Sequence, residues 1–450
     1  MKAALRIEPE VQSAAPPGSK GTLADQLIFF GIFGLLGFAP LAFGTVEPWS
    51  IVLFESAAAI LFVSWAVSQA KESELRISPS PLFAPMGAFA ALIALQILSG
   101  RTAYYYQTVH DGMLYCAYGV ICFLVVQCLR KTSQVNFLAT AASAYGLATA
   151  VYAIFQSITS QGKLYWLVTP RSGGWIYGPY VNHNHYAGLM EMLIPIPLVA
   201  AFTHLIRERS RKMLALGGAA VMASTIFLSG SRGGMIAFLV QIMILGLFLV
   251  RRRKSRRMAF ALTGFVVVLV GIVIWLGGRE LGNRVTSIRS ETSTEISGGT
   301  RLAIVRDGLK MWGARPLMGW GLGNFAQVFP QYRSFYTNLV VNEAHNDYLQ
   351  VLVEMGALGF AIGLWFLVRM YYGAAEKLGN WASNINGAMT LAAMLGCTGI
   401  LVHSLVDFNL QVPSNAAFFY VLCTLSAMEP RFPLLLHRPV TRRPYQNAVL

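Results

Sequence analysis

The stretch NEAHNDYLQVLVEMGALGF, residues 342–360, places a histidine and several polar side chains immediately before a long apolar segment. If that segment is a membrane helix, His345 stands where the helix leaves the bilayer and enters a polar loop. Membrane enzymes keep their chemistry at such places. A histidine at a membrane interface can equally be a solvated or capping residue, so the rest of the chain must decide between the two interpretations.

The composition is that of an integral membrane protein. Of 450 residues, 55% are hydrophobic and only 12% are charged, whereas an ordinary soluble domain has about 25% charged residues. Apolar runs of about 20 residues, the length that crosses a bilayer, recur along the whole chain. We predict an all-α, polytopic protein with about twelve transmembrane helices, near residues 26–46, 50–69, 82–98, 112–128, 135–158, 185–203, 213–228, 235–250, 258–278, 346–372, 384–405 and 414–428.

This pattern also predicts the domain organisation. A cytoplasmic tail (1–25) precedes the first nine helices (26–278), a long periplasmic loop (279–345) follows, and the last three helices (346–428) lead to a cytoplasmic tail (429–450). The first apolar run is as long as a full span, so we expect a retained helix and not a cleaved signal. The periplasmic loop is unusually long for a connection, which indicates a functional segment or one disordered in part.

The formal net charge of +15 is explained mainly by topology. With the N-terminus inside, most of the 35 Lys and Arg fall in cytoplasmic loops and tails, where basic residues are favoured. Nucleic acid is therefore not needed as a partner. A basic residue in a short external loop works against this orientation signal, which makes Arg101, Arg171 and Arg232 candidates for function, whereas Lys163 has no motif around it.

Two of these arginines lie in segments suited to anions. Arg171 belongs to an irregular loop rich in Gly and Pro that enters a helix, where Asn182 or Asn184 could cap exposed backbone amides. Arg232 lies in the tight turn 229–234, whose glycines let backbone approach a ligand. The planar guanidinium fits phosphate oxygens. Gly and Ser explain the turn itself, but they do not explain an arginine there.

The sequence does not predict a metal site or a cofactor. His183 and His185 are two residues apart and do not face each other on a helix, and no acidic partner completes a site. The five cysteines all lie in apolar runs and form no CxxC pair. We interpret them as residues of helix packing, neither disulfides nor metal ligands.

The long loop is predicted to contain an amphipathic helix on the outer surface. From Arg301 onward apolar residues recur at helical spacing, while Arg306 and Lys310 share a more polar side and Pro316 ends the pattern. The apolar positions are Leu302, Val305, Leu309 and Trp312. A glycine-rich turn through residues 316–325 follows, and aromatic residues then lead to His345.

Ionisable residues within apolar helices are functional candidates by default. Glu55, Glu191 and Glu354 are of this kind, and Glu55 lies far from any motif. Residues 403–415 place polar groups, among them His403 and an aspartate, at another external turn. That turn could therefore meet the His345 region.

Several of these residues resemble a known family. His345-Asn346, nine residues, Gly356, two residues and Gly359 are similar to the histidine motif of the O-antigen ligase and polymerase superfamily. Its members in the bacterial inner membrane transfer glycans from a polyprenyl diphosphate carrier on the periplasmic side. The likeness extends to residues 178–188, 229–234 and 301–325, the last resembling the family pattern of an arginine, a tryptophan and Pro-x-x-Gly-x-Gly.

The resemblance implies a metal-independent, inverting glycosyltransferase without a cofactor. His345 would activate the acceptor hydroxyl, and Arg232 and Arg301 would grip the donor diphosphate. A neutral imidazole is suited to general base catalysis near neutral pH. We favour Arg301 over Arg306 because of its distance from Trp312 and Pro316. The predicted substrate-binding residues are Arg171, Arg306, Asn182, His185, Asn346, Glu343 and Tyr348.

The sequence leaves more than one function open. An O-antigen ligase and a chain-extending polymerase of O-antigen or exopolysaccharide use the same polyprenyl diphosphate-linked donor and differ in acceptor, a lipid or another glycan. A glycan transporter would place its polar residues near the midplane, often in broken helices. A structural scaffold predicts no arginines in external loops. Polar residues here concentrate at one face, which favours an enzyme whose partners are donor, acceptor and membrane lipids.

Overall fold

A computed structural model describes residues 23–71, 77–169, 176–251, 298–337 and 340–428, with isolated helical positions between 264 and 271. Within these residues every regular element is a helix, and strand pairing is limited to two isolated bridges, at Leu164 with Val168 and Tyr177 with Tyr180. The all-α prediction is confirmed. Most of the predicted span 258–278, the loop segment 279–297 and Arg171 lie outside the described residues.

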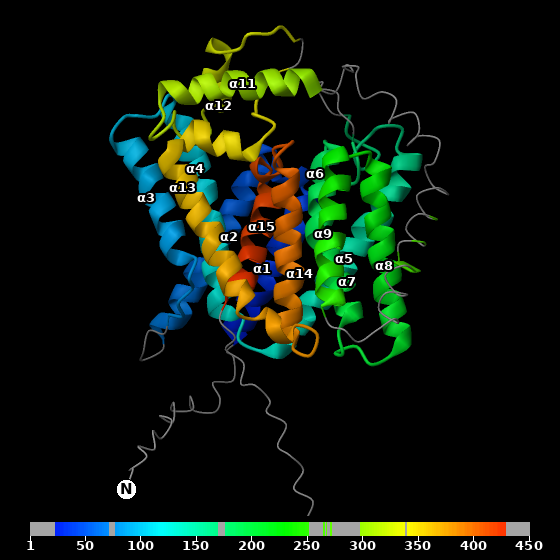
Figure 1. The fold of residues 1–450 in the computed structure, drawn as a ribbon. Coiled ribbons are helices and arrows are strands. Elements are labelled where there is room, and N and C mark those ends of the chain that lie inside the picture. Colours follow the sequence, from blue (N-terminus) through cyan, green and yellow to red (C-terminus); the bar gives the residue numbers. More distant parts are fainter. Residues whose placement is uncertain are drawn as a thin grey trace, which may run out of the picture.

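The long helices form one bundle (Figure 1). They are α1 (Leu23–Leu41), α2 (Pro48–Ala70), α3 (Phe83–Leu98), α4 (Tyr105–Cys128), α5 (Thr132–Thr159), α6 (His183–Leu193), α7 (Pro195–Phe202), α8 (Arg209–Ser229), α9 (Arg232–Val250), α13 (Asp347–Ala375), α14 (Ile385–His403) and α15 (Pro413–Ala427). Short helical turns are η1 (Phe43–Thr45), η2 (Phe329–Gln331), η3 (Leu378–Asn380) and η4 (Asn409–Gln411).

The chain is a multi-pass membrane protein. In the described part, 8 helical segments are long and apolar enough to cross a membrane, α6 and α7 counting together, and α1 and α3 are shorter apolar helices. Several predicted boundaries differ by a few residues, and two differences have a clear cause in the sequence. Helix α4 begins at Tyr105, before the predicted start at residue 112, and the predicted span 185–203 is divided at Pro195, because proline has no backbone N–H to continue the helix.

Helix α11 (Gly298–Ala314) lies across one end of the bundle, with the short α12 (Phe325–Val328) beneath it (Figure 1). We call this end the α11 end. The helix was predicted, but two of its four predicted apolar positions do not face the bundle. Leu302 and Leu309 are 70% and 46% exposed. The buried stripe passes instead through Ile304, Gly308 and Met311.

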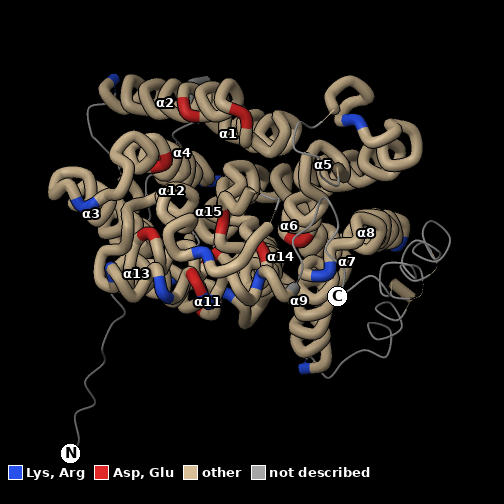
Figure 2. Tube along the Cα trace, turned by 90° about the horizontal axis from the view of Figure 1, so that it is seen from above, with Lys and Arg blue, Asp and Glu red and all other residues tan. Residues whose placement is uncertain are grey.

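The reason is a close approach between helices. A Cβ atom on Gly308 would lie 2.9 Å from Cδ2 of Leu349, which belongs to α13. The smallest residue of α11 therefore marks the face that packs on the bundle, whereas a pattern of large apolar side chains selects the leucines that face outward. Figure 2, which looks down on the α11 end, shows several Lys, Arg, Asp and Glu residues on and near α11.

Helix α13 is broken at Gly356, where φ is 66°, a conformation that L side chains avoid. Backbone groups of residues 316–321 form hydrogen bonds with the backbone groups of α13 on either side of the break. Four backbone hydrogen bonds cross it: Trp320 N to Val353 O (3.1 Å), Gly321 N to Glu354 O (2.9 Å), Ala357 N to Pro316 O (2.8 Å) and Leu358 N to Leu317 O (3.1 Å). The glycine-rich turn after α11 thus fixes the part of α13 before Gly356. The segment around His345 leads directly into that part of the helix.

Candidate active site

His345 lies in the turn that leads into α13. Its φ of 51° is left-handed, which is uncommon for a residue other than glycine. Asn346 holds this turn. Its side-chain oxygen accepts a hydrogen bond from Leu349 N at 2.9 Å, which caps α13. Its amide donates to the Leu405 carbonyl at 2.9 Å, so the start of α13 is tied to the segment that follows α14.

That segment brings Asp407 to His345. The imidazole Nδ1 lies 3.9 Å from Oδ1 of Asp407, and the two side chains are 15% and 2% exposed. The ring of Phe408 packs edge-on against the imidazole, with the ring centroids 4.8 Å apart. Burial lowers the pKa of His345 to about 4, although Asp407 opposes this shift, and Arg301 adds to it. At neutral pH the imidazole is therefore uncharged.

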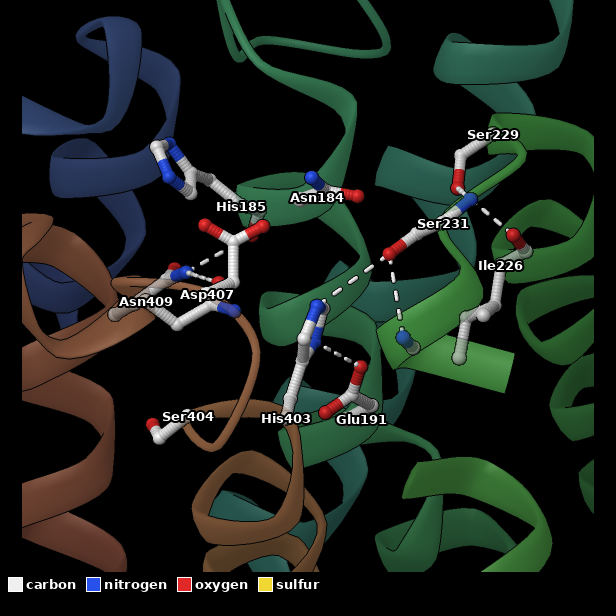
Figure 3. A network of polar contacts seen from close by, with 12 residues as sticks. Asn184, His185, Glu191, Ile226, Ser229, Ser231, His403, Ser404, Asp407 and Asn409 are labelled. Carbon is white, nitrogen blue, oxygen red and sulfur yellow. Dashed lines mark hydrogen bonds and ion pairs between the residues drawn. The ribbon is translucent and has the colours of Figure 1, made fainter. Parts of the chain in front are cut away.

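Asp407 is an ionised carboxylate at the centre of this site. Burial alone would raise its pKa, but nearby basic groups, His185 first and then Arg301, His345 and His403, lower it to about 2. His185 comes from α6 and lies close to Asp407 (Figure 3). Its ring packs edge-on against Phe408 with a centroid separation of 4.8 Å. The site thus combines residues from α6, α11, the start of α13 and the end of α14.

A second set of contacts, made by Asp347, fixes the segment that carries Asp407. The carboxylate of Asp347 accepts hydrogen bonds from Ser404 Oγ at 2.6 Å, Leu410 N at 3.1 Å and Gln411 Nε2 at 3.2 Å. The amide of Asp347 donates to the Ser404 carbonyl at 3.0 Å. Asp347, two positions after His345, therefore holds both ends of the loop that carries Asp407.

Arg301 reaches the same loop from α11. Its Nη1 donates to the Val406 carbonyl at 2.8 Å, and its Nε is buried without a hydrogen-bond partner among the described residues. Arg306, on the same helix, is exposed. The structure thus separates the two arginines between which the sequence left a choice, and it places Arg301 at the Asp407 loop.

The turn that carries Arg232 packs against this loop as well. Helix α8 ends at Ser229 and is capped by Gly230, whose φ is 76°. Ser231 caps α9 by accepting a hydrogen bond from Gly234 N at 3.2 Å. Arg232 follows as the first residue of α9 and is exposed. A Cβ on Gly233 would lie 2.4 Å from Cδ2 of His403 and 3.0 Å from Cγ2 of Val406. Here the glycine allows a close approach to the end of α14.

The other predicted binding residues make contacts within the protein. Asn182 caps α6 by accepting a hydrogen bond from Asn184 N at 2.8 Å, as predicted. The hydroxyl of Tyr348 donates to the Leu401 carbonyl at 2.8 Å. Glu343 accepts from Gln350 Nε2 at 2.7 Å. Burial, with nearby carboxylates, raises the pKa of Glu343 well above its usual value.

Two site features escaped the sequence prediction. Asp407 was not among the predicted site residues, although the polar run 403–415 was expected near His345. Glu191 was noted as a buried acid, but its partner was not. Its Oε1 lies 2.8 Å from Nδ1 of His403 (Figure 3). The signal that could have found Asp407 is the one that selected His345, an ionisable residue at the mouth of an apolar helix.

A cavity of about 730 Å³ lies beside the site. Its walls come from α2, α3, α4, α13 and α15 and are mostly apolar. Asp347, Ser404 and Gln411, which hold the Asp407 loop, also line it. A space of this size and polarity suits a hydrocarbon chain or another apolar group.

Within the residues that the structure describes, no group of three or more His, Cys, Asp or Glu side chains is arranged to hold a metal ion. The cysteines at positions 116, 122, 128, 397 and 423 are free thiols. The side chains described at the site are an imidazole, a carboxylate and a guanidinium group.

Residues 217–364 match the family model described as O-antigen ligase. No curated protein matches the chain. The matched region contains Arg232, Arg301 and His345, while His185 precedes it and Asp407 follows it. The chain is thus a multi-pass membrane protein whose residues 217–364 are similar to the O-antigen ligase family.

Proposed function

We propose that this protein is a metal-independent, inverting glycosyltransferase of the bacterial inner membrane. It moves a glycan from a polyprenyl diphosphate carrier to an acceptor hydroxyl at the α11 end, which faces the periplasm. One observation carries the proposal: a buried, neutral His345 lies beside the ionised Asp407, and Arg301 contacts the same loop. A base, a carboxylate to support it and a fixed cation are the groups that such a transfer requires.

The reaction is a single displacement. The acceptor oxygen attacks the anomeric carbon of the donor glycan, and the bond from that carbon to the diphosphate oxygen breaks, its electron pair leaving with the diphosphate. Because Nδ1 of His345 faces Asp407, Nε2 takes the proton of the acceptor hydroxyl. Asp407 then stabilises the imidazolium. The present separation of 3.9 Å exceeds a hydrogen bond, and such catalytic contacts often tighten when substrate binds.

Arg301 and Arg232 hold the diphosphate and offset the charge that develops on it. A guanidinium carries five N–H donors in a planar fork, and Arg301 uses one of them on Val406. We assign Arg306, Asn182 and His185 to donor binding, together with Arg171, which lies outside the described residues. Asn346, Glu343 and Tyr348 act by shaping the turn around His345, since their polar groups bond to other parts of the protein.

The cavity supports a lipid-linked substrate. It is bounded by helices of the bundle, it is mostly apolar, and its polar residues include three that hold the Asp407 loop. A glycan transporter is less well supported. The break in α13 is filled by backbone from residues 316–321 and so does not open an ion or sugar site, and the charged groups of the site gather at the α11 end.

Reconstitution of the purified chain with a polyprenyl diphosphate-linked glycan and a lipid acceptor tests the proposal. We expect glycan transfer that continues in excess chelator. Loss of transfer with chelator and recovery with magnesium or manganese would contradict metal independence, and failure to consume donor with any acceptor would contradict the function. Gene deletion then separates the acceptors: a ligase mutant lacks attached glycan, whereas a polymerase mutant has attached glycan of shortened length.

A further inference from the structure

A second polar chain lies behind the candidate active site (Figure 3). Oε1 of Glu191, on α6, is 2.8 Å from Nδ1 of His403, the last residue of α14. The other ring nitrogen of His403, Nε2, is 3.4 Å from Oγ of Ser231. All three side chains are fully or almost fully buried. The chain therefore connects three helices in the order α6, α14 and α9.

The last member of this chain holds the turn that carries Arg232. Ser231 Oγ also accepts the capping hydrogen bond from Gly234 N at 3.2 Å. A Cβ on Gly234 would lie 3.0 Å from Oε1 of Glu191, and one on Gly233 would lie 2.6 Å from Nε2 of His403. The turn is thus in tight contact with both partners of the buried pair. A shift of either partner must shift the turn.

A second anchor lies deeper in the bundle. Nε2 of Gln241, on α9, donates to the carbonyls of Glu191 at 2.8 Å and Leu395 at 2.9 Å. Helix α9 is therefore attached to α6 and α14 at this level independently of Ser231. Removing the polar chain should release only the first turn of α9 and leave the rest of the helix in place.

The order of carboxylate, imidazole and hydroxyl also occurs in serine hydrolases, where the hydroxyl is a nucleophile. Two observations oppose that role here. Ser231 is 0% exposed, so a substrate carbon does not reach it without opening the turn. Its oxygen also accepts the capping hydrogen bond of α9, which holds it against the backbone. A fixed cap is the simpler consequence of this geometry.

We propose that Glu191, His403 and Ser231 are positioning residues that fix the first turn of α9 and so direct Arg232 toward the donor diphosphate. The inference rests on the proposed function and adds to it the source of the arginine's orientation. The pair of Glu191 and His403 suits this role, because removing one member of a buried pair leaves the other uncompensated. The guanidinium of Arg301 has a separate anchor, the Val406 carbonyl.

A double-mutant cycle tests the inference. Binding of polyprenyl diphosphate to the full-length, detergent-purified chain is measured for Glu191→Gln, Arg232→Ala and the double variant. We expect Glu191→Gln to weaken binding by about 10- to 100-fold, the scale expected for a displaced substrate-holding group. The double variant should bind no more weakly than Arg232→Ala, because Glu191 acts only through that arginine. Losses that multiply in the double variant would overturn the proposal.

Variants of Ser231 provide the second arm. Ser231→Thr keeps a capping hydroxyl and should bind donor like the natural protein, whereas Ser231→Ala should weaken binding as Glu191→Gln does. A Ser231→Ala protein that binds donor normally but transfers nothing would overturn the proposal in favour of a nucleophile. If Glu191→Gln does not fold, Ser231→Ala carries the same cycle with Arg232→Ala, since it removes a single oxygen atom.

The matched control is Ser224→Ala. Ser224 is also 0% exposed and lies on α8, but its hydroxyl donates only to the Val221 carbonyl of its own helix, at 2.7 Å. We expect it to leave donor binding unchanged; weakening equal to that of Ser231→Ala would show that any lost buried hydroxyl has this effect. If the natural protein does not bind polyprenyl diphosphate, the proposed function fails. If the natural protein binds donor and transfers glycan, but the binding losses of the two single variants multiply in the double variant, only the positioning role fails.

Discussion

Nδ1 of His345 lies 3.9 Å from Oδ1 of Asp407, although the two residues belong to different loops at the α11 end. The relationship depends on Asp347 and Asn346, which bond the start of α13 to the loop after α14. It gives the proposed base a carboxylate partner that stabilises its protonated form. The predictions below test the consequences of this pair and of the contacts that hold it.

The first prediction concerns Asp407. Asp407→Asn keeps the shape of the side chain but loses the charge that stabilises the imidazolium, so turnover should fall by about 10²- to 10⁴-fold. Donor binding should stay within a few fold, because the carboxylate does not contact the diphosphate. Transfer and binding assays on one preparation measure both. Glu208→Gln, which removes an exposed carboxylate paired with Arg211, is the control, and equal losses in both variants would contradict the assignment.

The pH dependence follows from the lowered pKa of His345. A base acts in its neutral form, and a pKa of about 4 keeps the imidazole neutral above pH 5 or so. Turnover should therefore stay constant as the pH falls from neutrality and decline to half near pH 4. Asp407, with a pKa of about 2, stays ionised throughout. A decline centred between pH 6 and 7 would show that the titrating base is a solvated histidine.

Arg301 and Arg306 make a matched pair on α11. Arg301 bonds to the Asp407 loop, and Arg306 is exposed. If Arg301 offsets charge on the leaving diphosphate, Arg301→Ala should lower turnover by about 10²- to 10³-fold. Arg306→Ala should change it much less. Because both substitutions remove one positive charge from the same helix, the comparison excludes a general electrostatic effect, and an equal or reversed order would refute the role of Arg301.

Gly356 tests the link between α11 and the site. Its φ of 66° and a Cβ that would lie 2.3 Å from the Leu317 carbonyl oxygen exclude a side chain. Gly356→Ala should lower the free energy of unfolding by at least about 1–2 kcal/mol, the cost of a left-handed alanine, and should reduce transfer. Gly363→Ala, on the same helix with open space around it, should have little effect on thermal unfolding in detergent. Equal melting temperatures for the two variants would contradict the contact.

Much of the fold was predictable because a bilayer imposes apolar runs of about 20 residues. Hydropathy located the described helices, but it did not locate the polar first turns of α4 or the division at Pro195. It did not reveal which face of α11 packs on the bundle, because Leu302 and Leu309 outweigh Gly308 in any pattern of apolar size. The close contact of α11 with α13 depends on Gly308, which has no side chain.

The candidate site was predicted in part for a related reason. His345, Arg232 and Arg301 each stand in a local pattern, a helix mouth, a glycine turn and an amphipathic helix. Asp407 belongs to a polar turn whose place beside His345 depends on the hydrogen bonds of Asp347 to Ser404 and Gln411. Those contacts join segments far apart along the chain, so the sequence pattern alone does not reveal them.

The most direct test is one measurement of transfer and of donor binding on purified His345→Ala and Arg232→Ala. If His345 takes the acceptor proton, His345→Ala should lose turnover by about 10²- to 10⁴-fold while it still binds the lipid diphosphate donor. Arg232→Ala should weaken both binding and turnover, and Arg232→Lys should restore them only in part, because lysine keeps the charge without the planar fork. A His345→Ala protein that transfers normally, or that loses donor binding while Arg232→Ala keeps it, would contradict the account.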